Sequence, residues 1–193
     1  MLRSAISAAA AAAAVVLVLS ACGSGEPEAD PTEEAISAQT TAEAQDETAS
    51  EAPMAVPELL DFTATTVDGD DFEGASLAGA PAVLWFWQED CPICQSQGPD
   101  VAALIGAHGD RVAVVGVAGT GLYHDSTDEQ RQQFVADTGT GEATHLQSPD
   151  GELWTRFGVT SQSTYVLLDS AGEIADVGSF SADELDEKVA GLS

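Results

Sequence analysis

Apolar runs separated by turn signals predict strands from about residue 60 onward. Residues 82–87 form a continuous apolar run, as expected for a strand covered on both faces, and residues 112–117 form a second one. Residues 60–67 alternate around Phe62, and the Asp68-Gly69 turn signal and Asp71-Phe72 follow them, which predicts a hairpin. A strand at 164–168, the Ala171-Gly172 turn and a strand at 173–177 predict a second antiparallel pair.

Helical signals lie between these strands. One helix is predicted from Cys91 to about His108, with Pro92 in its first turn and Pro99 producing a kink. A capping box at 126–129 begins a helix that runs through Asp137 and ends at Gly139, and a second box at 181–184 begins the last helix. A short helical segment contains Trp154. The alternation predicts an α/β fold, with a central mixed sheet flanked by helices.

The first residues of the chain have the layout of a secretory signal. Residues 1–21 contain a basic start at Arg3, an apolar stretch through Leu19 and small residues before Cys22. The stretch is shorter than the roughly 20 residues of a confident membrane span. Leu19-Ser20-Ala21-Cys22 resembles a bacterial lipobox, which implies that Cys22 becomes a lipidated N-terminus. An ordinary signal or an uncleaved anchor with an incidental cysteine is the alternative.

Residues 22–55 are predicted to be a disordered acidic tether. They are rich in Ala, Glu, Thr and Ser and contain no Lys, Arg or aromatic residue, so they cannot bury enough apolar surface to offset the entropy of ordering. Residues 56–193 then form one domain, long enough for a core of its own. Its predicted core includes an aromatic and aliphatic set: Phe134, Trp154, Phe157, Tyr165, Leu167 and Leu168.

The charge of the chain excludes some partners. The sequence holds 33 acidic and 5 basic residues, a net charge of −28. Nucleic acid and anionic lipid headgroups are therefore poor partners. The acidity is interpreted as a source of solubility or an adaptation to salt, with attraction of basic partners as the alternative.

Two cysteines carry the clearest chemistry. Cys91-Pro92-Ile93-Cys94 directly follows the 82–87 strand, where a helix begins. Cysteines three positions apart meet across one helical turn, close enough for a disulfide, and backbone N–H groups stabilise a thiolate at a helix N-terminus. Cys91 is thus predicted as the nucleophile and Cys94 as the resolving cysteine, with both sulfurs reachable by solvent. A structural staple is the alternative, although closing so short a loop removes little chain entropy.

Several of these segments together resemble the thioredoxin superfamily: Trp85-Phe86-Trp87, the two cysteines with their spacing, Pro99, and Phe157-Gly158-Val159 before a strand. The nearest likeness is to extracytoplasmic TlpA-like and Dsb-type proteins of actinobacteria. The resemblance implies a thioredoxin-like fold with an added N-terminal β-hairpin, and disulfide exchange without a metal or organic cofactor. It also implies a set of residues that dock the partner chain: Trp87, Pro92, Gln162, Ser163 and Thr164.

The resemblance also implies partners and a location. The partners would be protein thiols and disulfides of the cell envelope, together with an unknown membrane or small-thiol redox partner. Lipid on Cys22 would hold the protein at the outer face of the cell membrane.

Three features depart from the family pattern. Ser163 stands where relatives usually carry a proline after a cis peptide bond, so the Gln162–Ser163 bond is either trans or cis at a cost of about 3–4 kcal/mol. Glu89 and Asp90 precede Cys91, and their negative charges oppose thiolate formation. Trp85 replaces the buried acid of cytoplasmic thioredoxins. Ile93, between the cysteines, offers a thiolate no positive charge or hydrogen-bond donor, and with Asp90 adjacent this predicts a potential more reducing than that of the strongest periplasmic oxidants, while the actinobacterial likeness points the other way.

Two further functions compete with disulfide exchange. Copper delivery would use Cys91 and Cys94 with a histidine, because soft thiolates suit Cu(I). The candidate histidines are His108, interpreted as a helix C-cap, His124, interpreted as exposed, and His145, interpreted as surface or half-buried before a strand. A redoxin-type peroxidase would need a Thr-x-x-Cys setting and a nearby arginine, where this chain has Glu89 and Asp90.

Overall fold

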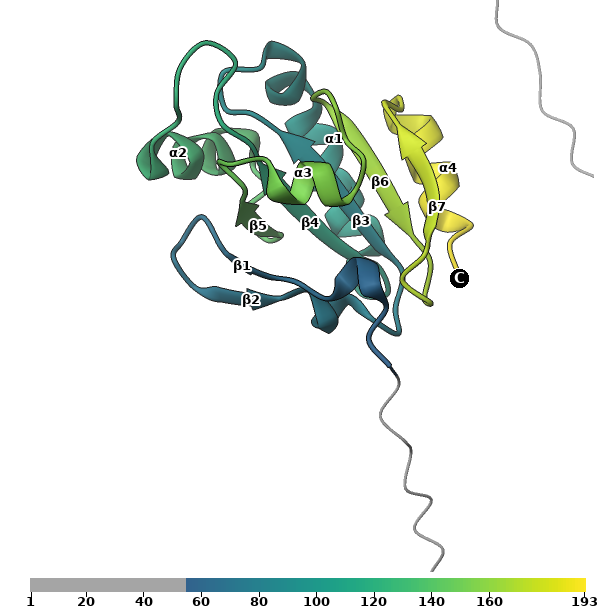
Figure 1. Ribbon diagram of the computed structural model, residues 1–193. Helices are drawn as coiled ribbons and strands as arrows, with labels where there is room; N and C mark the ends of the chain where they lie inside the picture. The colour runs from purple at the N-terminus through teal and green to yellow at the C-terminus, as the bar shows by residue number, and fades with distance from the viewer. Residues whose placement is uncertain (1–54) are drawn as a thin grey trace, which may run out of the picture. The chain divides into compact units, whose positions relative to one another are not determined.

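A computed structural model describes residues 55–193 (Figure 1). The predicted signal segment, Cys22 and all but the last residue of the predicted tether lie outside these residues. Among the helices of the described part, none has the length and apolar composition needed to cross a membrane.

The centre of the fold is a mixed sheet of five strands in the order β5-β4-β3-β6-β7. Strand β3 is parallel to β4, and β4 to β5, whereas β6 is antiparallel to both β3 and β7. The predicted mixed sheet is therefore confirmed. The strands are β3 (Ala82–Trp87), β4 (Ala113–Ala118), β5 (Thr144–Gln147), β6 (Thr164–Leu168) and β7 (Ile174–Gly178).

Helices cover both faces of this sheet (Figure 1). They are α1 (Pro92–His108), α2 (Asp128–Thr138), α3 (Glu152–Arg156) and α4 (Ala182–Ala190), with short 3₁₀ turns η1 (Glu58–Leu60) and η2 (Gly74–Leu77) near the N-terminal side. Side chains of β3 alternate between the two layers: Trp85 and Trp87 pack with residues of α1, α2 and α4, whereas Leu84 and Phe86 pack with residues of α3 and the N-terminal segment. All six residues of β3 are buried, as the continuous apolar run predicts.

The predicted core is confirmed, with one residue less deeply placed than the others. Phe134, Phe157, Tyr165, Leu167 and Leu168 are buried. Trp154 is partly buried, and its ring lies edge-on to Phe86 at a centroid distance of 5.4 Å. The domain therefore has one apolar layer on each side of the sheet.

The N-terminal hairpin is present and lies along the edge of β5. Strands β1 (Thr63–Thr65) and β2 (Asp71–Glu73) pair antiparallel, and Gly69 in the turn has φ = 92°, a conformation that glycine adopts readily. The hairpin is held to β5 by backbone and side-chain bonds: Val67 N donates to His145 O (2.8 Å), and Gln147 Nε2 donates to Thr66 O (3.0 Å).

The structure contains a strand, β5, at residues 144–147, where the sequence analysis gives no strand. The segment Thr-His-Leu-Gln is short and half polar, so its sequence carries no run that distinguishes it from a loop. It becomes a strand because β4 on one side and the hairpin on the other satisfy its backbone.

The start of α2 is a second correction. The capping box is formed by Thr127 and Gln130, one residue later than predicted, and Thr127 Oγ1 accepts from Gln130 N. Ser126 is not the cap because its hydroxyl donates to Glu89 Oε2. The other predicted helix ends are confirmed: Gly139 has φ = 70° after α2, and Ser181 with Glu184 caps α4.

Candidate active site

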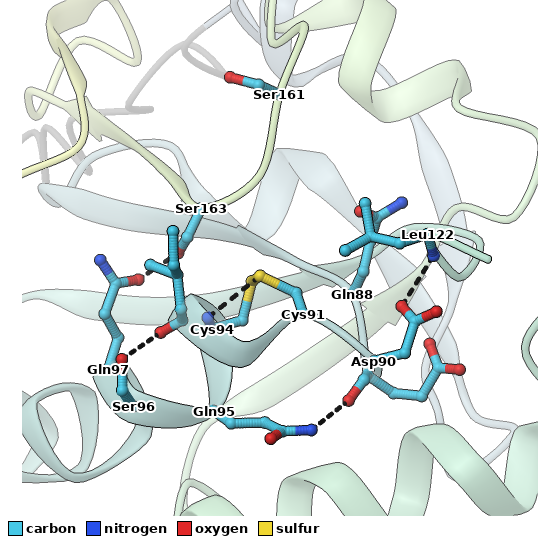
Figure 2. The surroundings of a disulfide bond; sticks show 12 residues. Gln88, Asp90, Cys91, Cys94, Gln95, Ser96, Gln97, Leu122, Ser161 and Ser163 are labelled. Atoms are coloured by element: carbon cyan, nitrogen blue, oxygen red, sulfur yellow. Dashed lines mark hydrogen bonds between the residues drawn. A yellow bond between two sulfur atoms is a disulfide. The ribbon is translucent and has the colours of Figure 1, made fainter.

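The two cysteines lie where strand β3 leads into helix α1, and they are joined by a disulfide (Figure 2). Their Cα atoms are 5.3 Å apart, within the usual range for a disulfide. Cys91 is the N-cap of α1, Pro92 occupies the first turn, and Cys94 N donates to Cys91 Sγ at 3.1 Å. When the pair is reduced, this N–H and the helix dipole would stabilise a thiolate on Cys91.

The sulfurs are less accessible than the sequence analysis predicts. Cys91 is 2% exposed and Cys94 is fully buried, so the expectation that solvent reaches both is wrong. Both cysteines belong to the apolar cluster that contains Trp85 and Trp87, and these rings cover them from the sheet side. Cys91 keeps a small exposed fraction, whereas Cys94 keeps none, and their roles as nucleophile and resolving cysteine stay predictions. Ile93, between them, is 59% exposed and marks the outer surface of the site.

The carboxylates before Cys91 have partners of their own, which the sequence did not indicate. Asp90 accepts two backbone hydrogen bonds from the segment between β4 and α2, from Leu122 N (2.7 Å) and Tyr123 N (3.0 Å). Glu89 accepts from the Ser126 hydroxyl, and its backbone carbonyl accepts from Gln95 Nε2 (2.9 Å). Both acids therefore anchor the β4–α2 connection beside the disulfide.

Ser163 lies in a buried hydrogen-bond network on the other side of the site. The Gln162–Ser163 peptide bond is cis, the second of the two alternatives that the sequence left open. Trp85 Nε1 donates to Ser163 Oγ (2.9 Å) and to Gln97 Oε1 (3.3 Å), and the Ser163 hydroxyl donates to Gln97 Oε1 (Figure 2). Gln97 is a residue that the sequence analysis missed. The sequence signal that could have identified Gln97 is its position one helical turn after Cys94.

Replacing Ser163 by alanine is expected to lower the free energy of unfolding by about 1–3 kcal/mol. The buried indole N–H of Trp85 would keep only its longer bond to Gln97, and Gln97 would lose a donor. Urea denaturation measures the loss. Ser161→Ala, at an exposed position of the same loop, is the matched control and should change stability by less than about 0.5 kcal/mol. Equal effects of the two substitutions would contradict the network.

The predicted docking residues divide into surface and interior ones. Trp87 is fully buried and stacked on Phe134, with ring centroids 4.1 Å apart, so its side chain offers no contact to a partner in this structure. This corrects the predicted docking role and follows from the cover that α2 provides. Pro92 is exposed, and Gln162 and Thr164 are partly exposed, whereas Ser163 is buried.

A pocket of about 350 Å³ borders this loop. Gln162, Gln88 and Trp154 are among its lining residues. Gln88 Oε1 and Trp154 Nε1 are buried without a hydrogen-bond partner, so one acceptor and one donor remain unused there. Because both atoms have almost no exposed surface, the pocket as it stands offers a partner chain a recess rather than these two polar groups.

His145 is buried inside β5 rather than half-exposed before a strand, which corrects the sequence interpretation. Its Nδ1 accepts from Trp87 Nε1 (3.2 Å), and its Nε2 donates to Thr140 O (3.0 Å), an arrangement that requires the neutral ring. Burial lowers the pKa of His145 below the ordinary value of 6.5, against smaller raising effects of the Thr140 bond and of Asp68. Gly116 on β4 makes room for this contact, since a Cβ there would lie 2.0 Å from His145 Nδ1.

The lowered pKa of His145 predicts that stability falls as the medium becomes acidic. In the unfolded chain the imidazole takes up its proton near pH 6.5, whereas in the folded protein it does so only at lower pH. The unfolded state therefore binds more protons below about pH 6.5, and the unfolding free energy drops there by up to about 1.4 kcal/mol per pH unit. The prediction is tested by denaturing wild type and His145→Gln at pH intervals of about one unit between pH 7.5 and 4.5. The difference in unfolding free energy between the two proteins should shrink as the pH falls. A difference that stays constant with pH would contradict the prediction.

Neither of the other histidines is grouped with the sulfurs as a potential metal ligand. His108 Nε2 pairs with Asp186 Oδ1 at 2.8 Å near the end of α1, and His124 is exposed, as predicted. Over residues 55–193, the clustered ligand side chains are Glu89, Asp90 and His124, and neither cysteine belongs to that group. The copper alternative therefore has no histidine ligand beside Cys91 and Cys94 in this structure.

Comparison with known proteins agrees with this geometry. Residues 56–177 match the AhpC/TSA family. The soluble secreted antigen MPT53 of Mycobacterium tuberculosis is 35% identical over 144 residues, which cover 72% of this chain and 79% of that protein. The sporulation thiol-disulfide oxidoreductase A of Bacillus subtilis is 31% identical over 147 residues, covering 72% and 82%.

Solved structures show the same fold. The structure of MTB dsbF in its mixed oxidized and reduced forms has a TM-score of 0.65 and 42% identity, covering 72% of this chain and 99% of that one. A secreted Mycobacterium tuberculosis disulfide oxidoreductase homologous to E. coli DsbE has a TM-score of 0.63 and 36% identity, covering 70% and 98%. The predicted thioredoxin-like fold is confirmed.

Proposed function

This chain belongs to the AhpC/TSA family of the thioredoxin superfamily and is a thiol–disulfide oxidoreductase; we propose that it acts outside the cytoplasm, on protein thiols and disulfides of the cell envelope, from a lipid anchor on Cys22. The observation that carries the proposal is the Cys91–Cys94 disulfide at the point where β3 leads into α1. The secreted relative from Mycobacterium tuberculosis supports the location.

The exchange proceeds through Cys91. In the reducing direction its thiolate attacks one sulfur of a partner disulfide, a mixed disulfide forms, and the partner's other sulfur leaves as a thiolate. Cys94, which loses its proton to solvent, then attacks Cys91 Sγ. The Cys91–Cys94 disulfide re-forms, the partner leaves with both sulfurs reduced, and two electrons have passed to it. The oxidising direction is the reverse, and neither requires a metal or organic cofactor.

The partner chain is proposed to dock across the surface formed by Pro92, Ile93, Gln162 and Thr164. These residues are exposed or partly exposed around the cysteines. The pocket of about 350 Å³ that Gln162 lines supports this placement, because a side chain of the partner can enter it. Burial of Cys91 means that a docked chain must reach its sulfur over Ile93 or after a small opening of the helix start.

Disulfide exchange is tested with the purified protein in two assays, insulin reduction followed by turbidity and reactivation of reduced ribonuclease. Activity in either assay supports the proposal. Inactivity in both, with tight binding of one equivalent of Cu(I), would favour the copper alternative. Consumption of peroxide without either activity would favour the peroxidase.

The lipid anchor is tested by Cys22→Ser. We expect wild type to partition into the detergent phase of Triton X-114, and the variant into the aqueous phase, because one residue carries the anchor. Mass spectrometry of the N-terminal peptide should show lipid on Cys22. An unmodified Cys22, or the same partition for both proteins, would contradict the anchor and leave the redox activity unaffected.

A further inference from the structure

Three potential metal ligands meet beside the disulfide, on the side away from Ser163. Glu89 and Asp90 follow strand β3, and His124 comes from the β4–α2 connection. One ligand atom from each lies within 4.8 Å of the other two. His124 Nδ1 is 3.7 Å from Glu89 Oε1, and its Nε2 is 4.0 Å from Asp90 Oδ2. Sequence positions 89 and 124 are brought together by the parallel pairing of β3 and β4.

Glu89 gives an independent indication that the cluster binds a cation. Its side chain is only 8% exposed, and although Oε2 accepts from Ser126, Oε1 is buried without a hydrogen-bond partner. A buried carboxylate oxygen with no donor is costly, because its desolvation is not compensated. Gly121 passes directly over this atom: a Cβ there would lie 3.2 Å from Glu89 Oε1. Oε1 is also the Glu89 atom that lies 3.7 Å from His124 Nδ1, so the unpartnered oxygen points toward the cluster.

No lysine or arginine of residues 55–193 compensates the two carboxylates. The four basic side chains are engaged elsewhere: Arg111 with Val189 O, Arg131 with Asp128, Arg156 with Glu58 O, and Lys188 with Asp176. Within the described part of the chain, the histidine beside these two acids is His124, and its nitrogens stand 3.7 Å from Glu89 Oε1 and 4.0 Å from Asp90 Oδ2, beyond hydrogen-bond distance. The cluster thus has two negative charges and space for a positive one.

We propose that Glu89, Asp90 and His124 bind a divalent transition-metal cation of the zinc class. Two carboxylates and an imidazole are a ligand set that suits Zn²⁺, with water in the fourth position. Ligand bonds of about 2.1 Å place tetrahedral ligand atoms about 3.4 Å apart, so ligand atoms that now lie within 4.8 Å of one another would have to approach by up to about 1.4 Å. His124 is exposed and can make that movement.

The surroundings already orient the ligands. Asp90 is fixed by Leu122 N and Tyr123 N, and Glu89 by Ser126. His124 Nδ1 donates to Asp125 O at 3.3 Å, which leaves Nε2 with the free lone pair. Such outer hydrogen bonds are typical of protein metal sites. A bound ion would tie the β4–α2 connection to the residues that precede Cys91.

The site is tested by isothermal titration of zinc chloride into the full chain carrying Cys22→Ser, with Cys91–Cys94 oxidised so that no thiol competes. We expect saturation at one equivalent, and a loss of affinity of about tenfold or more in Glu89→Gln and in His124→Ala. His108→Ala is the matched control, since His108 also faces a carboxylate but far along α1, and it should bind zinc like wild type.

Three results would overturn the proposal. They are no zinc binding by folded protein, unchanged affinity in His124→Ala, and displacement of zinc by an equal concentration of calcium chloride, which would indicate unselective binding to acidic surface. His124 is exposed, so its alanine variant should fold even if Glu89→Gln does not, and thermal unfolding of each variant checks this. Disulfide exchange in the insulin assay is measured separately, so failure of the metal site leaves the redox function standing.

Discussion

Cys91→Ser is expected to reduce disulfide exchange to the uncatalysed rate. A hydroxyl at this position cannot attack a disulfide, and Cys94 cannot substitute for it because Cys94 is fully buried behind Cys91. The initial rate of insulin reduction by dithiothreitol measures the effect. The N-cap position tolerates serine, since serine is a preferred N-cap residue, so the variant should keep its fold.

Cys94→Ser is the matched variant, and it should behave differently. Cys91 can still attack, but the mixed disulfide is not resolved from within the chain, so partner protein accumulates on Cys91. Peptide mass spectrometry after acid quenching identifies the linked cysteine. Trapping through Cys94 in Cys91→Ser, or the absence of partner protein linked to Cys91 in Cys94→Ser, would contradict the assigned order of attack.

Trp87→Ala is expected to cost about 3–5 kcal/mol of unfolding free energy, the largest stability loss that we predict. The ring is fully buried and stacked on Phe134, and its N–H donates to buried His145. A domain whose whole stability is roughly 5–15 kcal/mol would be left marginal. Urea denaturation followed by circular dichroism gives the difference.

Two further substitutions separate packing from hydrogen bonding at this position. Trp87→Phe keeps a stacked ring but leaves His145 Nδ1 without its donor, and should cost about 1–3 kcal/mol. Trp154→Ala removes a ring that is only partly buried, and should cost less than Trp87→Ala. A loss below about 1 kcal/mol in Trp87→Ala would show that the stack contributes little.

Local sequence patterns predict the structure correctly where a segment's own residues determine it. Strand β3 has the predicted bounds because six successive apolar residues favour a strand buried on both faces. The start of α1 follows from Pro92 and the cysteine spacing. The cysteine pair, which defines the candidate site, could therefore be recognised from sequence.

Features made by distant residues could not be predicted in this way. Trp87 was expected at the rim of the site, but Phe134 of α2, far along the chain, covers it. His145 is buried because Trp87 and Thr140 satisfy both ring nitrogens, and neither contact leaves a trace in the short β5 sequence. The Trp85, Gln97 and Ser163 network likewise joins three separate segments.

A redox titration tests the central claim most directly. The purified protein is equilibrated with mixtures of reduced and oxidised glutathione, free thiols are alkylated, and the products are counted by mass spectrometry. We expect Cys91 and Cys94 to be reduced together in one reversible two-electron transition. The ratio of reduced to oxidised protein should change tenfold for about 30 mV of redox potential. Cysteines that stay oxidised until the domain unfolds would identify the disulfide as a structural staple and contradict the redox function.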